Sequence, residues 1–492
     1  MRNHPYRVLT APRPPGDSAA VFKDDMSRSE TAEPPAADPL VPGTRAPESE
    51  GPATAVQESA AQETAGQEGA SQESLRRVAV ASFIGTAIEF YDFYVYGTAA
   101  ALVLNGAFFP NLSPINATLA SFSTYAVAFA ARPIGSLVFG HFGDRVGRKS
   151  VLVASLLLMG LSTACVGLLP GYSTLGVWAP VLLVLLRFLQ GVGLGGEWGG
   201  AALLAVEHAP RGRRGLFAAF PQLGPSVGFF AATGIFWLLS ASLDDGSFAS
   251  WGWRVPFLLS FLLVAVGLFV RLRISETPVF AKVMADQEAS RAPALEVFKR
   301  HPKEILLGAG GMIIAYGLFY TATTYCLSYG TATLGVPRGT MLAVSLVACL
   351  FLAGGTWLAA TRSDAAGRRK LVLAGAGLAV VWGFVLFPLM DTEQPVLIAL
   401  ALGGALFCMG VVYGPMGAYL PELFGARVRY SGASFAYNLG GVLGGAVSPL
   451  VATRLQGSLG SSSVGWYVSA MAVVSLLCVL ALPETREREI GL

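Results

Sequence analysis

Residues 395–421 read PVLIALALGGALFCMGVVYGPMGAYLP, a run without a single charged side chain. At a rise of about 1.5 Å per residue, about 20 helical residues cross the hydrocarbon core of a bilayer, which is roughly 30 Å thick. Backbone in contact with lipid must satisfy its own hydrogen bonds, and a helix does so within one segment. Barrel strands are about ten residues long and alternate in polarity. The run therefore predicts a transmembrane helix.

Similar apolar runs follow one another from Val78 onward. The chain of 492 residues is 53% hydrophobic and only 13% charged, whereas a soluble protein carries about 25% charged residues. We therefore predict an all-α polytopic membrane protein with twelve transmembrane helices. The predicted spans are 79–104, 117–140, 150–170, 178–207, 214–242, 253–272, 303–328, 340–361, 371–390, 395–421, 430–454 and 464–482.

Residues 1–75 have a different composition, rich in Ala, Pro, Glu, Gln and Ser, and the first 74 carry twelve acidic against six basic residues. Such a segment buries too little apolar surface to fold alone. No apolar stretch follows a basic start, so it is not a signal peptide. We expect a disordered, acidic cytoplasmic tail. A docking role for the tail and a start at Met26 remain alternatives.

Lys and Arg concentrate in alternate loops, among them the loop after the second predicted span and the basic stretch from Arg271 to Lys303. The loops on the other side contain only Arg254, Arg338 and Arg454. Positively charged loops stay in the cytoplasm. We therefore expect a multi-pass protein of the cell (plasma) membrane with both termini in the cytoplasm.

The two halves of the chain repeat each other. The segment Gly143-Asp144-Arg145-Val146-Gly147-Arg148-Lys149 recurs as Ser363-Asp364-Ala365-Ala366-Gly367-Arg368-Arg369. Likewise, Glu207 followed by Gln222-Leu223-Gly224 is echoed by Glu422 followed by Asn438-Leu439-Gly440. The repeat predicts two pseudo-symmetric six-helix bundles, 76–272 and 303–492, joined by a central cytoplasmic loop, 273–302. In transporters built from repeats, the substrate site lies near the midplane between them.

Several of these segments carry a family resemblance. The loop Gly140–Lys149 resembles the signature loop of the major facilitator superfamily. Glu89-Phe90-Tyr91-Asp92-Phe93, followed by Tyr96-Gly97, is similar to the metabolite:proton symporter branch of that superfamily. The other segments that resemble this branch are 131–135, 187–191, 195–199 and 251–257.

The resemblance covers about 76–490 and is greatest to shikimate- and α-ketoglutarate-type carriers. It implies the major facilitator fold and import of a small polar, carboxylate-bearing metabolite together with protons. The expected partners are the substrate, protons and the lipid bilayer, and we expect the monomer to be functional.

Charged residues inside the predicted spans are the candidates for chemistry, because a charge at the bilayer centre costs at least about 2.5–3.5 kcal/mol on insertion scales. Glu89 and Asp92 share one helical face with Tyr96. Paired carboxyl groups in a low dielectric suit a proton carrier. The alternative is a fixed ion pair of these carboxylates with Arg132 or Arg187.

Arg132 and Arg187 keep their protons and grip carboxylates bidentately, so we expect either to contact substrate or to neutralise a buried acid. Gln190, in the matched segment of Arg187, joins the candidate site. Glu197, among glycines, is either a proton site or a structural partner. Arg254 either steers anions inward or anchors the interface. The polar groups of the second half, which we interpret mainly as helix contacts, are Tyr316, Tyr320, Tyr325, Tyr413, Tyr437 and Asn438.

The resemblance also implies a gating clamp at the cytoplasmic loops. It would involve Asp144, Arg145, Arg148 and Glu207 in the first half and Asp364, Arg368 and Glu422 in the second. Ala365 replaces the counterpart of Arg145, which predicts a weaker clamp in the second half. We further expect Glu422 and Arg429 to mirror Glu207 and Arg214.

Other classes of function find little support in the sequence. The five cysteines and four histidines are scattered, so no metal site is expected. No catalytic set and no phosphate-binding Gly-rich loop is present; we expect no enzyme activity, no cofactor and no nucleic-acid partner. Two alternatives remain: a proton antiporter that exports its substrate, on a partial Gly-Pro motif at 224–228, and a symporter of a zwitterionic osmolyte such as proline or betaine.

Overall fold

The computed structural model describes residues 80, 82–146, 148–195, 198–207, 209–210, 212–273, 297, 299–425 and 428–488. All of these belong to one compact unit, Ala65–Leu492. The acidic tail expected at 1–75 and most of the loop expected at 273–302 lie outside the described residues.

The described part of the first half is built from helices and short turns. Residues 82–102 form its first helix. The elements that follow are α2 (Leu104–Phe108), α3 (Pro114–Val146), α4 (Arg148–Leu168), α5 (Tyr172–Leu175), α6 (Trp178–Leu194), α7 (Trp198–Glu207), α8 (Arg214–Ser242), α9 (Asp245–Ser250), the 3-10 turn η1 (Gly252–Arg254) and α10 (Val255–Arg273).

The second half is likewise helical, with three π-helical turns that continue the neighbouring α-helices. Its elements are α13 (Pro302–Tyr320), η2 (Thr321–Tyr325), α14 (Cys326–Ser328), η3 (Tyr329–Thr333), α15 (Arg338–Ala366), α16 (Arg368–Met390), α17 (Pro395–Glu422), α18 (Arg429–Gly440), η4 (Gly441–Ala446), α19 (Val447–Leu459) and α20 (Ser461–Leu480).

Nine of the described helices are long and apolar enough to cross a membrane. Two further predicted spans fall on the shorter apolar stretches Val153–Leu168 and Trp178–Leu194, and the remaining one is the helix 82–102, which carries Glu89 and Asp92. The predicted spans thus coincide with helices, and the prediction of an all-α polytopic membrane fold is confirmed.

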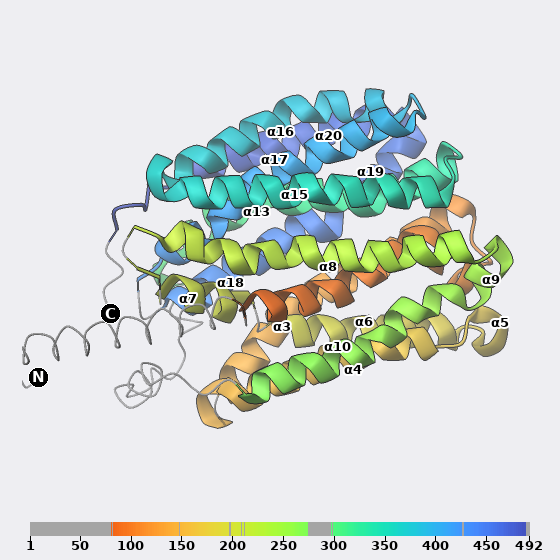
Figure 1. The fold of residues 1–492 in the computed structure, drawn as a ribbon, viewed down its shortest axis with the longest axis horizontal. Helices are drawn as coiled ribbons and strands as arrows, with labels where there is room; N and C mark the ends of the chain where they lie inside the picture. The colour runs from red at the N-terminus through yellow and green to blue at the C-terminus, as the bar shows by residue number, and fades with distance from the viewer. Residues whose placement is uncertain are drawn as a thin grey trace, which may run out of the picture. The chain divides into compact units, whose positions relative to one another are not determined.

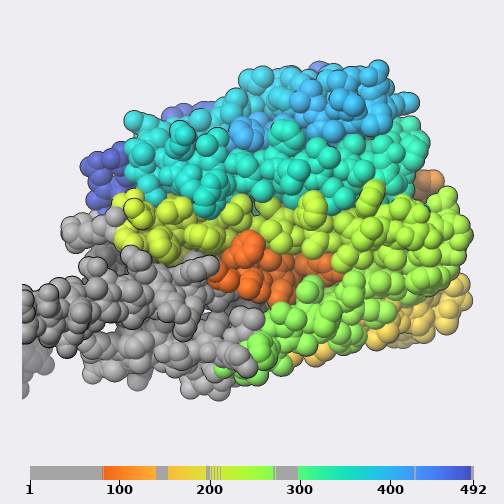
Figure 2. All heavy atoms as spheres, viewed as in Figure 1, coloured from red at the N-terminus to blue at the C-terminus, as the bar shows by residue number. Residues whose placement is uncertain are grey.

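Two helices occupy the interior. In the helix 82–102, every residue from Ile88 to Ala101 is buried, and α13 is buried along most of its length. α13 is apolar on all sides beyond its first turn, and such a helix belongs in an interior. Figure 2 shows only a narrow strip of the helix 82–102 (orange-red) on this face, between α8 and α10.

The two halves meet along helices that are distant in sequence. α8 lies along α15 (Figure 1) and also contacts α17. In a second contact region between the halves, α3 contacts α18, η4 and α19. The central site therefore has walls from both halves.

Glycines allow the helices of each half to pack backbone against backbone. A Cβ atom at Gly195 of α6 would lie 2.0 Å from the carbonyl oxygen of Arg132 in α3. In the second half, a Cβ at Gly414 of α17 would lie 2.4 Å from the carbonyl oxygen of Thr356 in α15. Small residues at such crossings are typical of membrane helices, and the same crossing occurs in both repeats.

Candidate functional site

Four charged residues lie in the interior of the first half. Glu89 and Asp92 come from the helix 82–102, Arg132 from α3 and Arg187 from α6, and none is more than 4% exposed. The structure therefore brings the predicted acids and bases into the core of one bundle. Glu197 lies outside the described residues.

Arg187 is held by an aromatic ring and an amide. Its guanidinium carbon lies 3.7 Å from the centroid of the Tyr96 ring, and its Nη1 donates a hydrogen bond to Oε1 of Gln190. Among the described residues, its Nε and Nη2 have no hydrogen-bond acceptor. Since buried donors are normally paired, these two N–H groups are available for a ligand.

Arg132 has similar surroundings. Its guanidinium lies 4.4 Å from the ring centroid of Phe93 and 4.3 Å from that of Phe129. Its Nε and Nη2 also lack an acceptor within the described part of the chain. The ring of Phe93 lies 5.1 Å from the guanidinium of Arg187 as well, so one ring contacts both cations.

The described residues contain no ion pair between Arg132 or Arg187 and a carboxylate. Cation–π contacts surround both guanidinium groups, because four aromatic side chains pack against them: Phe93 and Tyr96 of the helix 82–102, and Tyr125 and Phe129 of α3.

Asp92 belongs to a hydrogen-bonded chain that reaches Arg187 through Gln190. The Ser260 hydroxyl on α10 donates to Oδ1 of Asp92 over 2.6 Å. Nε2 of Gln190 donates to the Thr163 hydroxyl on α4 (2.7 Å) and to the Asp92 carbonyl (3.3 Å). Sequence reasoning missed Ser260 and Thr163, because a single hydroxyl in an apolar run carries no signal.

Tyrosines from the two halves meet beside these charges. Tyr96 shares a hydrogen bond with Thr124. Tyr320 of α13 lies 5.4 Å from Tyr125 and 5.3 Å from Phe129, ring to ring. The tyrosines of the second half thus pack across the interface, as helix contacts would, yet several of them also line a cavity.

That central cavity has a volume of about 10 Å³, barely room for one water molecule. Small-molecule sites usually measure about 300–1,000 Å³. The structure therefore shows the centre in a closed form. The lining residues are Phe90, Tyr94, Pro225, Ala315, Tyr316, Phe319, Tyr320, Met409, Tyr413 and Tyr437.

Arg254 lies away from this centre. Its Nη1 donates to the carbonyl oxygens of Gly167 (3.0 Å) and Leu169 (2.6 Å) at the end of α4, and its guanidinium lies 4.4 Å from the Trp253 ring centroid. These contacts favour anchoring over the steering of anions.

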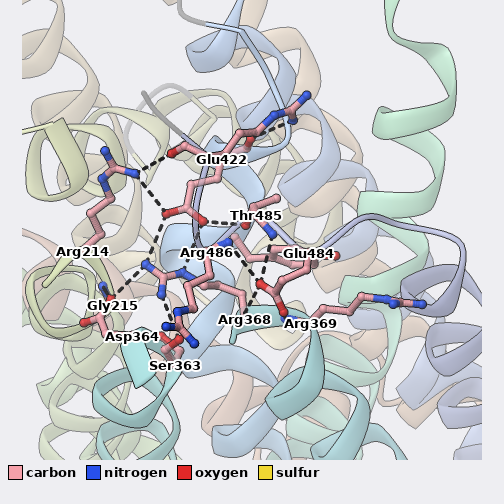
Figure 3. A network of polar contacts seen from close by, with 12 residues as sticks. Arg214, Gly215, Ser363, Asp364, Arg368, Arg369, Glu422, Glu484, Thr485 and Arg486 are labelled. Atoms are coloured by element: carbon pink, nitrogen blue, oxygen red, sulfur yellow. Dashed lines mark hydrogen bonds and ion pairs between the residues drawn. The ribbon is translucent and has the colours of Figure 1, made fainter. Parts of the chain in front are cut away.

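A polar network that includes Arg214 and Arg368 occupies one end of the molecule (Figure 3). We call this end, where Arg429 pairs with Glu207, the basic end. Asp364 accepts hydrogen bonds from the backbone N–H groups of Gly215 (2.8 Å) and Leu216 (3.0 Å), at the start of α8. A carboxylate is stabilising at a helix N-terminus. The last turn of α15, in the second half, thereby binds the start of a helix of the first half.

Arg368 and Glu422 form the buried centre of this network. Arg368 pairs with Asp364 at 2.9 Å and with Glu422 at 3.3 Å. At the position of Ala365, Arg486 of the C-terminal segment donates a hydrogen bond to the backbone carbonyl over 2.6 Å. The side chains of Asp144, Arg145 and Arg148 lie outside those that the structure describes.

The C-terminal segment adds groups that sequence reasoning did not include in the site. Oε1 and Oε2 of Glu484 accept from the N–H groups of Arg368 (2.9 Å) and Arg369 (3.1 Å), at the start of α16. The Thr485 hydroxyl donates to Glu422 over 2.6 Å. The dipeptide Glu-Thr occurs after the sixth and the twelfth predicted spans, as Glu276-Thr277 and Glu484-Thr485, which is the only hint that the sequence offers.

Comparison with known proteins identifies the family. Residues 82–449 match the Major Facilitator Superfamily. The chain belongs to the Major Facilitator Superfamily. It is a membrane transporter rather than an enzyme, and the described residues contain no cluster of side chains suited to a metal ion.

Within the superfamily, the chain is similar to several bacterial proteins. It is 49% identical over 422 residues to the "Inner membrane metabolite transport protein YhjE" of Escherichia coli K12 (85% of this chain, 96% of that protein). It is 39% identical to the shikimate transporter of the same strain (84% and 95%) and 30% identical to its proline/betaine transporter (84% and 84%).

Solved structures of the superfamily have the same fold. The proton:xylose symporter XylE superposes with a TM-score of 0.70 at 19% identity, covering 85% of this chain and 98% of XylE. At this identity the likeness concerns the fold alone.

Proposed function

We propose that this superfamily member is a proton-coupled symporter of the inner membrane that imports a small, carboxylate-bearing metabolite. The observation that carries the proposal is the pair of buried arginines, Arg132 and Arg187, beside the interface of the two halves; their Nε and Nη2 atoms have no acceptor among the described residues. Guanidinium groups bind carboxylates through paired hydrogen bonds. Such buried charge is costly unless a substrate anion offsets it.

Glu89 and Asp92 are the proposed proton-binding groups. Both are buried in the helix 82–102, and Asp92 is linked to Arg187 through Gln190. The link to Gln190 runs through the backbone carbonyl of Asp92, whereas its carboxyl group accepts from Ser260; protonation of either carboxyl group would still alter the charge near the substrate anion. Substrate and proton would therefore bind in a coupled manner.

Alternating access is the proposed mode of transport. Because the central cavity holds barely one water molecule, the halves must separate at one end to admit substrate. We assign the basic end to the cytoplasm by the distribution of Lys and Arg, which places both termini there. A single chain supplies all walls of the site, so we propose that the monomer is the working unit.

Zwitterionic osmolytes form the second candidate substrate class. The aromatic rings around the cavity suit a quaternary ammonium group, and the proline/betaine transporter is among the similar proteins. A zwitterion would use the arginines for its carboxylate and the rings for its cation.

A binding panel tests the substrate class. The purified protein is heated with shikimate, α-ketoglutarate, citrate, proline and betaine, each paired with its carboxamide where one exists, since a bound ligand raises the unfolding temperature. We expect stabilisation by an anionic carboxylate and none by its amide. Stabilisation by betaine or proline alone would favour the osmolyte, and equal stabilisation by acid and amide would contradict a carboxylate site.

A further inference from the structure

We propose that Gln222 and Asn438 form two amide clamps that hold the halves together between the central cavity and the basic end, and that both clamps break when the transporter opens toward that end. This inference goes beyond the proposed function and does not depend on which substrate is carried.

The first clamp joins α8 to α17. Gln222 is 1% exposed, and its Nε2 donates a hydrogen bond to the carbonyl oxygen of Tyr413 over 2.7 Å. α17 can approach this closely because Gly417 faces the amide; a Cβ atom there would lie 2.7 Å from Cγ of Gln222.

The second clamp joins α18 to the first half. Nδ2 of Asn438 donates to the Ser136 hydroxyl of α3 (3.2 Å) and to the carbonyl oxygen of Gly195 at the end of α6 (3.4 Å). Ser136 itself donates to the Gly195 carbonyl. Asn438 therefore contacts α3 and α6 where these two helices are packed together.

The clamps are equivalent in the internal repeat. Gln222-Leu223-Gly224 and Asn438-Leu439-Gly440 are the echoed segments of the sequence, and the fourth and tenth spans supply the carbonyl acceptors. One amide that crosses the interface would be an ordinary packing contact. Here an amide side chain of each half contacts a backbone carbonyl of the other half, at equivalent positions of the repeat. This repetition indicates that the contacts belong to the pseudo-two-fold symmetry of the molecule.

The position of the clamps points to a gate. Gln222 follows Arg214 by eight residues and Asn438 follows Arg429 by nine, which places each about 12–14 Å from the basic end. Both clamps adjoin the cavity. Tyr413, which lines it, supplies the carbonyl acceptor of Gln222, and Tyr437, which also lines it, precedes Asn438 in the sequence. Separation of the halves at the basic end must pull α8 from α17 and α18 from α3.

Both bonds suit a reversible gate because they are uncharged. In the open form, water would satisfy the released amides and carbonyls, so the net stabilisation by each bond is small; removal of one shifts the open-to-closed ratio by about fivefold. Two independent bonds shift it by about twenty-five-fold.

Hydrogen–deuterium exchange of the full-length protein in nanodiscs without substrate tests the proposal. We expect Gln222→Met and Asn438→Leu each to speed exchange about fivefold in residues 214–221 and 429–437. The double variant should speed exchange further, and residues 338–346 at the opposite end should be unchanged. Unchanged exchange at the basic end in folded variants would overturn the proposal.

Two matched comparisons separate a clamp from general packing. Thr356, the repeat counterpart of Ser136, has a buried hydroxyl without a partner among the described residues, so Thr356→Val should leave exchange unchanged. Gly417→Ala should displace the side chain of Gln222 without changing its chemistry. At Gly354, by contrast, an added Cβ atom would have no atom within 4 Å. Of the two glycine variants, we expect faster exchange in Gly417→Ala only. Equal effects of the two glycine variants would overturn the clamps. An effect of Thr356→Val as large as that of Gln222→Met would do so too.

Discussion

Arg429 of α18 lies 3.8 Å from Glu207 of α7, across the interface between the halves. The counterpart pair, Arg214 of α8 with Glu422 of α17, has a separation of 4.0 Å. Each pair thus joins the arginine of one half to the glutamate of the other. The two glutamates differ in burial, because the side chain of Glu207 is 39% exposed and that of Glu422 is fully buried.

This difference predicts unequal effects of neutralising the two acids. Glu422→Gln leaves Arg368 in the interior with Asp364 as its remaining carboxylate partner, so the loss is at most the roughly 3–5 kcal/mol that breaking a buried pair costs. Glu207→Gln removes a partly exposed pair that is worth about 1 kcal/mol or less. Thermal unfolding in detergent should show a large fall in melting temperature for the first variant and a small one for the second. Equal falls would contradict the ranking.

The cap that Glu484 provides at α16 predicts a measurable loss of stability. Glu484→Ala removes the acceptor of two backbone N–H groups, and loss of a cap costs about 1 kcal/mol. The control is Glu487→Ala, since Glu487 is an exposed acid three residues away. We expect a lower melting temperature for the first variant only, and a similar fall in both would argue against capping.

Replacing Arg187, which we propose binds the substrate, should weaken binding without unfolding the protein. Arg187→Lys keeps the charge but loses the planar fork that grips a carboxylate, so we expect KM for the acid to rise about tenfold or more. Arg254→Lys is the control, because Arg254 contacts carbonyl oxygens at the end of α4. Uptake measured against substrate concentration distinguishes them; an unchanged KM in Arg187→Lys would remove Arg187 from the binding site.

Asp92 should be required for proton coupling. Asp92→Asn keeps the size of the side chain and an acceptor for Ser260, but it cannot take up a proton. We expect exchange of labelled substrate across the membrane to persist while accumulation driven by a proton gradient is lost. Asp244→Asn, at an exposed helix cap that asparagine also fills well, should retain both activities. Full coupling in Asp92→Asn would exclude Asp92 as the proton site.

The sequence predicted the helices and the buried charges well, because both depend on local composition. A long run such as 395–421 has no alternative to a transmembrane helix. The burial of Asp92 and Arg187 follows from their position inside such spans. The repeat also placed Glu422 and Arg429 as counterparts of Glu207 and Arg214.

The contacts between helices could not be predicted from the sequence. Whether Arg187 faces a carboxylate or the ring of Tyr96 depends on how the helix 82–102 is rotated against α6. Likewise, the hydroxyl of Ser260 reaches Asp92 only because α10 packs beside that helix. The crosswise pairing of Arg429 with Glu207 depends on how the two halves dock, which no local pattern specifies.

Proton-driven uptake in proteoliposomes tests the central claim most directly. The protein is reconstituted with an inward-directed proton gradient, and the accumulation of the carboxylate identified by the binding panel is followed with and without a protonophore. We predict accumulation above the external concentration that collapses when the protonophore is added. Loss of preloaded substrate under the same gradient, or accumulation that is indifferent to the gradient, would contradict proton symport.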